Sequence, residues 1–189
     1  MMKTKTWILI LLLAAGGVVF LSHQDSPLGR SLRYGMEDLF YGERQIELCL
    51  LGEEQVILDF GGHFQDPGAE AFSVCSSLKS IALPNSLRTI GDREFYTTPS
   101  LTRVELGQGV ETIGSQAFCV SGLTSLPIPG SVKTIGSEAF KGLALESVTL
   151  GQGVAAIGDS AFEETALTAV TIPGSVQSIR ASAFKKTPL

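Results

Sequence analysis

The chain has 189 residues, of which 44% are hydrophobic and 17% are charged, which suits one folded domain preceded by a short leader. Its net charge is −5, and Lys and Arg gather only in single pairs such as Lys185-Lys186. Because nucleic-acid-binding domains usually carry a basic face, this composition argues against nucleic acid as a partner.

The N-terminus reads as an export leader. Lys3 and Lys5 precede residues 7–21, which carry no charge and are almost wholly apolar. As a helix this run would reach roughly 22 Å, which is short of a ~30 Å hydrocarbon core. We therefore predict that residues 1–21 form a signal peptide or signal anchor, and that the protein is extracytoplasmic, either secreted or membrane-anchored at the cell surface.

Two fates of the leader remain open. Cleavage after Gly16 or after Gly17 places small residues at −3 and −1, and it leaves residues 18–21 at the start of the mature chain. The alternative is an uncleaved anchor whose Lys-bearing end stays in the cytoplasm. In that case residues 7–21 are the only expected membrane contact.

Residues 22–54 are the least regular part of the chain. Residues 46–50 alternate like a short strand. We predict a linker that also caps the first coil of the repeats described next, because an uncapped end coil exposes an apolar face.

Residues 55–189 repeat one sequence. Clear copies, such as LTRVELGQGVETIGSQAF, open at intervals of 22 residues, and two weaker copies precede them. The openings of the clear copies are Leu101, Leu123, Leu145 and Leu167. Each copy ends in a phenylalanine, and these predicted core residues are Phe72, Phe95, Phe118, Phe140, Phe162 and Phe184. A fixed period of roughly 20 to 50 residues indicates a solenoid, so we predict about six stacked coils of 22–23 residues.

Each copy also predicts its own local structure. The opening LTRVEL alternates like a strand, and a turn and a second extended piece follow it. Gly114 then permits a bend, and Ser115 is placed to cap a short helical turn that drives Phe118 into the core. One coil cannot bury its own apolar slice, so stability is expected to come from stacking.

The turn after the first strand alternates between two forms. The alternating residues are Gly61, Pro84, Gly107, Pro129, Gly151 and Pro173. This second rhythm suggests duplication of a pair of coils, residues 101–144 and 145–188. Pro129-Gly130 suits the centre of a type II turn, in which Gly takes a positive φ.

The final coil departs from the pattern. Arg180 replaces the glycine of the bend, and Ala181 replaces the capping residue, so we expect this coil to be the least stable. Leu189 stands where a seventh coil would begin. An apolar end of this kind predicts self-association, a partner that covers the end, or a longer parent protein.

The repeats resemble the BspA-like leucine-rich repeats of bacterial surface proteins. The resemblance rests on the recurring IG-x-x-AF motif and on the C-s-s-L that follows Phe72. It implies a right-handed leucine-rich solenoid, a β/α superhelix that is mostly β with short helical turns and has one strand per coil on an inner, concave sheet. It also implies exported proteins, some of which are adhesins that bind host matrix proteins or other cells.

The three cysteines allow at most one internal disulfide. They are Cys49, Cys75 and Cys119. The family often places a buried small cysteine at the position of Cys75, and this is our main interpretation. A bridge between Cys49 and Cys75 is the alternative.

No motif points to catalysis, a metal or a cofactor. His23 and His63 lack the neighbouring Cys, His or Asp spacing of a metal or catalytic site. We interpret Glu163-Glu164 as a solvated loop and not as an acid–base pair. We therefore predict no enzyme activity and no bound cofactor.

The outward positions of the first strands form the candidate ligand surface. These residues are Ser80, Ala82, Arg103, Glu105, Ser125, Pro127, Ser147, Thr149, Ala169 and Thr171. They are mostly small and uncharged, which suits a protein or glycan ligand, and Arg103 is the best candidate for a dominant contact.

The leading hypothesis is a non-enzymatic, exported interaction scaffold that binds or adheres through the concave sheet. The alternative is a self-assembling structural solenoid or a fragment of a larger surface protein. An accessory domain of an enzyme would need a site within residues 22–54, the only part that neither the leader nor the repeats explain.

Overall fold

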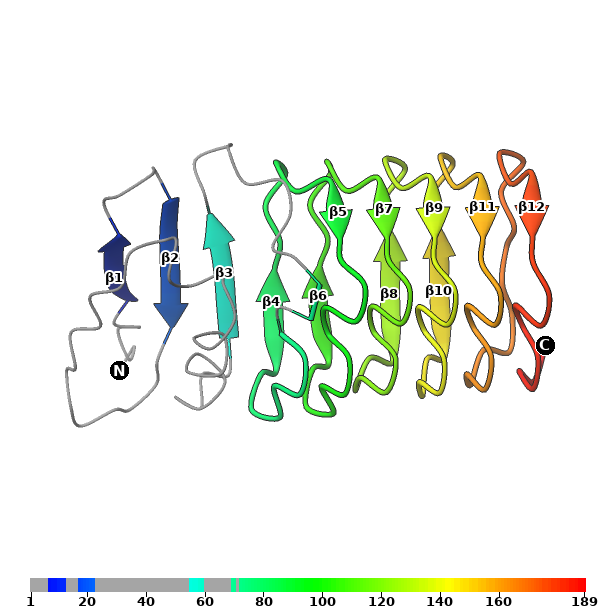
Figure 1. Ribbon diagram of the computed structural model, residues 1–189, viewed down its shortest axis with the longest axis horizontal. Helices are drawn as coiled ribbons and strands as arrows, with labels where there is room; N and C mark the ends of the chain where they lie inside the picture. The colour runs from blue at the N-terminus through cyan, green and yellow to red at the C-terminus, as the bar shows by residue number, and fades with distance from the viewer. Residues whose placement is uncertain (1–6, 13–16, 23–54, 60–68, 71) are drawn as a thin grey trace, which may run out of the picture.

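The computed structural model is a leucine-rich repeat solenoid, as predicted, and it describes residues 7–12, 17–22, 55–59, 69–70 and 72–189. Its coils follow one another along the long axis from β4 to β12 (Figure 1). We number them from the repeats: coil 2 is 78–100, coil 3 is 101–122, coil 4 is 123–144, coil 5 is 145–166 and coil 6 is 167–188. Coil 1 precedes them and includes Phe72.

Each interior coil contributes two short strands: one on the first face, as the resemblance implied for the inner sheet, and a second where the sequence predicted a second extended piece. The first face of the solenoid consists of β4 (Ser80–Ala82), β6 (Arg103–Glu105), β8 (Ser125–Ile128) and β10 (Ser147–Leu150). The second face consists of β5 (Thr89–Ile90), β7 (Thr112–Ile113), β9 (Thr134–Ile135), β11 (Ala156–Ile157) and β12 (Ser178–Ile179). The extra strands arise because the extended piece after each turn pairs in parallel with the same piece of the neighbouring coils.

The apolar N-terminal run forms strands, although we had considered it as a helix. β1 (Trp7–Leu12) and β2 (Gly17–Ser22) pair in antiparallel fashion, and β2 also pairs with β3 (Gln55–Asp59), which continues in parallel to β4. The backbone groups of β3 that would otherwise lie at a sheet edge are thus paired with β2, which favours a strand over a helix here. The predicted cap at residues 22–54 lies outside the described residues, except for Ser22.

The phenylalanines form one continuous file, with successive ring centroids 5.1–5.5 Å apart and interplanar angles of 2–16°. The rings of Phe95, Phe118, Phe140 and Phe162 are fully buried. Burial of one such side chain contributes about 1.5–3 kcal/mol, so the file is a major part of the core.

The phenylalanine edge, which we define as the turns around these rings, is not helical. Gln116 and Val120, on either side of Phe118, lie at φ of 56° and 59°. Their N–H groups donate to the next coil, to Ser137 O at 2.9 Å and Lys141 O at 3.4 Å. The prediction that Ser115 caps a short helical turn is therefore wrong, because these N–H groups are used between coils and not within a helix.

Glycines allow the coils to approach closely at the bend before the phenylalanine edge. A Cβ on Gly114 would lie 2.7 Å from Gly91 C, and a Cβ on Gly136 or Gly158 would lie 2.6 Å from the carbonyl carbon of the preceding glycine. Gly91, Gly114, Gly136 and Gly158 thus form a glycine ladder. Arg180 ends this ladder, and it is exposed.

The Pro and Gly turns use the same hydrogen bond. Val110 N–H donates to Gly107 O and Val132 N–H donates to Pro129 O, both at 3.2 Å. Pro129 is therefore the first residue of its turn and not the second. Gly142 is the only described glycine with a positive φ, so the type II prediction for Pro129-Gly130 is wrong.

Candidate interaction surface

The first face brings most of the predicted surface residues into register. Ser80 lies opposite Arg103 and Ala82 opposite Glu105, in the pair β4–β6. In β8–β10, Ser125 lies opposite Ser147, and Pro127 lies opposite Thr149. These four strands lie side by side in the lower half of the solenoid in Figure 1.

Alternation along each strand separates this surface from the core. Val104 and Val148 are buried, whereas Arg103, Ser147 and Thr149 beside them are exposed. Ser80 and Ala82 are half-buried. Thr171 and Ala169 are exposed but belong to no strand, so the sheet does not position these residues.

Arg103 is already engaged within the protein. Its Nη2 lies 2.5 Å from Glu105 Oε1, and the two side chains are 72% and 59% exposed. An ion pair this exposed contributes little to stability. It does orient the guanidinium, so any ligand must either share Arg103 with Glu105 or compete for it.

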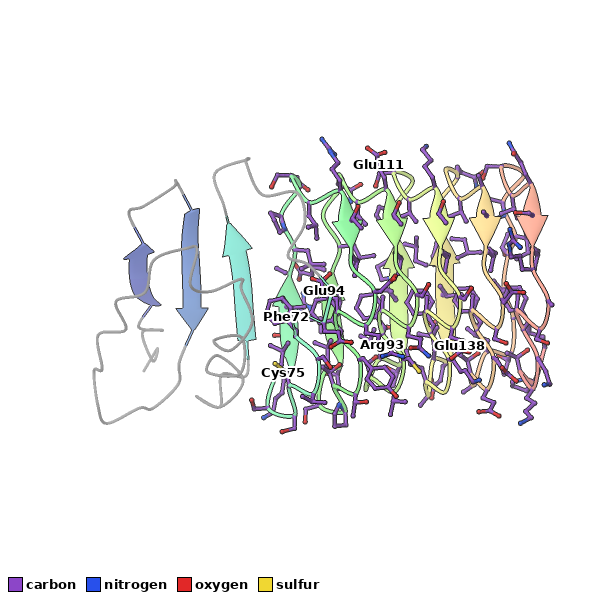
Figure 2. The ribbon with its side chains drawn as sticks, in the orientation of Figure 1. Phe72, Cys75, Arg93, Glu94, Glu111 and Glu138 are labelled. Carbon is purple, nitrogen blue, oxygen red and sulfur yellow. The ribbon has the colours of Figure 1, made fainter. Side chains whose placement is uncertain are left out.

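A polar row follows the phenylalanine edge, and the sequence analysis did not find it. Arg93 Nε donates to Gln116 Oε1 at 2.6 Å, and Gln116 Nε2 donates to Glu138 Oε2 at 2.9 Å. Figure 2 shows Arg93 and Glu138 along the same edge as Phe72. All three polar residues have positive φ. Non-glycine residues rarely adopt this conformation, so the residue types gave no signal for it. The one available signal was that all three residues stand at the same offset before a phenylalanine.

Glu163 corrects the interpretation of Glu163-Glu164 as a solvated loop. The Glu163 side chain is only 8% exposed, and it pairs with Lys141 Nζ at 3.2 Å and Lys185 Nζ at 3.3 Å. Hydrogen bonds from Ser160 and then Lys141 lower the pKa of Glu163 from 4.5 to about 2. Glu163 therefore stays ionised and joins coils 4, 5 and 6.

The cysteines differ in state. Cys75 is buried, as in our main interpretation, and it is also disulfide-bonded, which favours the bridged alternative. Cys119 is a buried free thiol, and burial is the main cause that raises its pKa. Cys49, which the alternative names as the partner of Cys75, lies outside the described residues.

We found no constellation for metal chemistry in the part of the chain that the structure describes, where no three His, Cys, Asp or Glu side chains converge. His23 and His63 both lie outside that part. None of the described segments is a helix with the length and apolar character needed to cross a membrane.

The repeats that form the stacked coils also match a known protein family. Residues 65–189 match the BspA type Leucine rich repeat region in 6 copies. The chain belongs to the BspA-type leucine-rich repeat family. Among curated proteins, the comparison found no match.

Solved structures provide further comparisons for this BspA-type protein. A leucine-rich repeat protein from Eubacterium ventriosum has a TM-score of 0.60 at 19% identity, over 65% of this chain and 32% of that one. A leucine rich cell surface protein from Faecalibacterium prausnitzii has a TM-score of 0.44 at 25% identity, over 65% and 45%. The T. pallidum Leucine Rich Repeat protein has a TM-score of 0.42 at 28% identity, over 59% and 71%.

These likenesses bear on the fold alone. At 19% identity the E. ventriosum protein shares the solenoid, and the other two scores are too low to add to the argument. This BspA-type chain spans about a third of the length of the E. ventriosum protein.

Proposed function

We propose that this BspA-type protein is an exported, non-enzymatic scaffold that binds a protein or glycan through its first face. Repeat solenoids typically present extended surfaces to partners. The observation that carries the proposal is the row of exposed side chains that β6, β8 and β10 present over a buried core. These side chains are short on β8 and β10, which pair in register, and charged on β6.

The chemistry of this face favours an extended ligand. Ser125, Ser147 and Thr149 offer hydroxyl groups that can both donate and accept hydrogen bonds. No side chain on these strands is an aromatic anchor, so we expect binding to be spread over several coils. Arg103 adds one charged contact at the N-terminal side of this row.

A binding experiment can test the face directly. The full chain is applied to an array of glycans and matrix proteins, and the retained ligand is then titrated against Thr149→Lys and Thr134→Lys. Both threonines are exposed, but Thr134 lies on the second face. We expect Thr149→Lys alone to weaken binding. Equal loss in both variants, or in neither, would exclude the first face as the binding surface.

Export is the second part of the proposal, and mass spectrometry of the secreted protein tests it. A cut after Gly16 or Gly17 would separate β1 from β2 and leave residues 18–21, which pair with residues 56–59 of β3. The mature chain would thus keep the strand that covers the β3 edge. Recovery of the full-length protein from the cytoplasm would reject export.

Self-association is a second candidate function, which rests on coil 6. Among the described residues, Ile172 and Ile179 of this coil are 39% and 47% exposed, and Leu189 beyond it is 53% exposed. Light scattering over a range of concentrations should reveal oligomers that Ile179→Lys disrupts. A monomer at all concentrations would remove this candidate and leave the binding proposal intact.

A further inference from the structure

The first face is divided between coils 3 and 4. β4 bonds to β6 and β8 bonds to β10, but β6 and β8 belong to different sheets. The second face behaves differently, because its five strands form one sheet that crosses the same joint. Between coils 2 and 3, and between coils 4 and 5, strands pair on both faces. Between coils 3 and 4, strands pair on the second face alone.

Pro127 explains the division. In coils 2 and 3, Leu83 N–H donates to Glu105 O at 2.9 Å, so the backbone groups of residue 105 face the preceding coil. Pro127 holds the same position in coil 4, and it has no N–H to donate towards β6. The equivalent bond one coil later would run from Leu106 N–H to Pro127 O. This bond is also missing among the described residues.

The phenylalanine edge is loosest at the same joint. The rings of Phe118 and Phe140 are 5.5 Å apart, whereas the spacing is 5.1 Å at the joints on either side. The bond from Val120 N–H to Lys141 O measures 3.4 Å, compared with 2.9 Å for the equivalent bond from Gly142 to Glu163. The other two bonds of this edge across the joint, from Gln116 N–H to Ser137 O and from Phe118 N–H to Ala139 O, both measure 2.9 Å, so the edge stays bonded while the first face is divided.

The turns after the first strand agree with this division. A Cβ on Gly107 would lie 2.2 Å from Pro84 O in coil 2, and a Cβ on Gly151 would lie 2.5 Å from Gly130 N in coil 4. In coil 4, by contrast, the positions of Gly107 and Gly109 are held by Pro129 and Ser131, which already carry a Cβ. Coils 3 and 5 thus pack tightly on the coils before them.

We propose that the joint between coils 3 and 4 is a hinge built into the solenoid. It separates two rigid pairs of coils, 78–122 and 123–166, and it opens on the first face while the continuous second face holds the pairs together. The missing donor of Pro127 sets its position. Because the candidate ligand surface spans both pairs, the hinge lets that face change its curvature, although the hinge itself does not depend on any ligand.

Other joints support the role of Pro127. β3 and β4 pair across the joint between coils 1 and 2, where coil 2 carries Ala82 at the equivalent position. Coil 5 carries Thr149 there, and β10 pairs with β8. Coil 6 forms no strand at residues 169–172, although Thr171 holds this position and keeps its N–H, so the first face is also unpaired between coils 5 and 6. Proline therefore accounts for the joint between coils 3 and 4 and not for that one.

Amide hydrogen exchange of the full chain, followed by NMR, tests the hinge. Leu83 and Leu106 occupy the same position in successive coils, so after correction for intrinsic rates they form a matched pair. We expect the Leu106 amide to exchange at least about ten-fold faster than that of Leu83, because it lacks an inter-coil acceptor. Equal protection of the two amides would overturn the proposal.

Two variants extend this test. Pro127→Thr restores the donor and should slow exchange at Leu106 by about ten-fold while leaving Leu83 unchanged. Thr149→Pro should create a second hinge and speed exchange at Ile128. An unchanged Leu106 rate in folded Pro127→Thr would show that proline does not set the joint. If a variant fails to fold, the comparison within the wild-type chain still decides.

The bending motion needs its own measurement. Spin labels introduced through Ala82→Cys and Thr149→Cys would lie on opposite sides of the joint. The distance distribution between them should be broad in the wild-type background and narrower with Pro127→Thr. The same width in both backgrounds would contradict a hinge, even if the exchange rates differed.

Discussion

Two sets of glycines follow different rules in this solenoid. In the glycine ladder, each of Gly114, Gly136 and Gly158 lies so close to the preceding coil that a Cβ would meet backbone at 2.6–2.7 Å. In the turn after the first strand, the glycines divide by position: a Cβ on Gly109 would lie 1.9 Å from Asn85 O, whereas a Cβ on Gly130 or Gly174 would meet no atom closer than 4.0 Å. Gly130 and Gly174 stand where the alternate coils carry the exposed Gln108 and Gln152.

The difference separates two levels of repetition. The ladder follows the 22-residue period and holds every interior coil in the same way. The turns follow a two-coil period. A coil whose turn has the Gly form packs on the preceding coil, whose turn has the Pro form. The tight pairs are 78–122 and 123–166, whereas the sequence had suggested duplicated pairs 101–144 and 145–188, offset by one coil.

The largest expected effect is on the core that both periods share. Phe118→Ala should lower the free energy of unfolding by about 3–5 kcal/mol, because the neighbouring rings hold the cavity open. Phe184→Ala is the matched control, since Phe184 is only partly buried and stacks on one ring alone. Chemical denaturation measures both variants. A loss at Phe184 as large as at Phe118 would show that coil 6 is as well packed as the interior.

The difference between the two sets of glycines can be tested by adding one methyl group to a member of each set. Gly136→Ala should cost about 1–3 kcal/mol, because its Cβ would overlap the backbone of Gly114. Gly130→Ala adds the same group in open space at a φ that is not positive, so it should be neutral or stabilise by about 0.4–1 kcal/mol. Thermal denaturation distinguishes them, and equal losses would refute the distinction between ladder and turn.

The smallest effect concerns the ion pairs across coils 4 to 6, which neither glycine set controls. The pKa of Glu163 is lowered from 4.5 to about 2, so the stability it contributes is fully present above pH 4.5 and is lost as pH falls towards 2. Acid titration of unfolding should show this loss in the wild type and not in Glu163→Gln. Glu164→Gln is the control, because that carboxylate is 43% exposed and pairs only with Lys186 among the described residues. Parallel acid curves for wild type and Glu163→Gln would contradict the assignment.

Much of the fold could be predicted because it depends on spacing. The 22-residue step fixes which apolar residues meet between coils, so the solenoid and the order of the phenylalanines follow from the sequence. The strand alternation around Val104 and Val148 was predictable for the same reason. The exposure of Arg103 and Thr149 then follows, because side chains alternate along a strand.

Other features depend on backbone conformations that residue types do not reveal. Gln116, Glu138 and Val120 adopt positive φ, although glycine, asparagine and aspartate are the usual residues there. The inter-coil hydrogen bonds of the phenylalanine edge stabilise this conformation, and they form only after stacking. The same limit applies to Glu163, whose two lysine partners lie in neighbouring coils.

The most direct test of the stacked solenoid is the contact pattern of its aromatic rings. Nuclear Overhauser effects between ring protons, recorded with phenylalanine-labelled full-length protein, report which rings are neighbours. The structure predicts contacts only between successive rings, from Phe72 through Phe184, at centroid separations of 5.1–5.5 Å. A contact between Phe95 and Phe162, or no contact between Phe118 and Phe140, would contradict it.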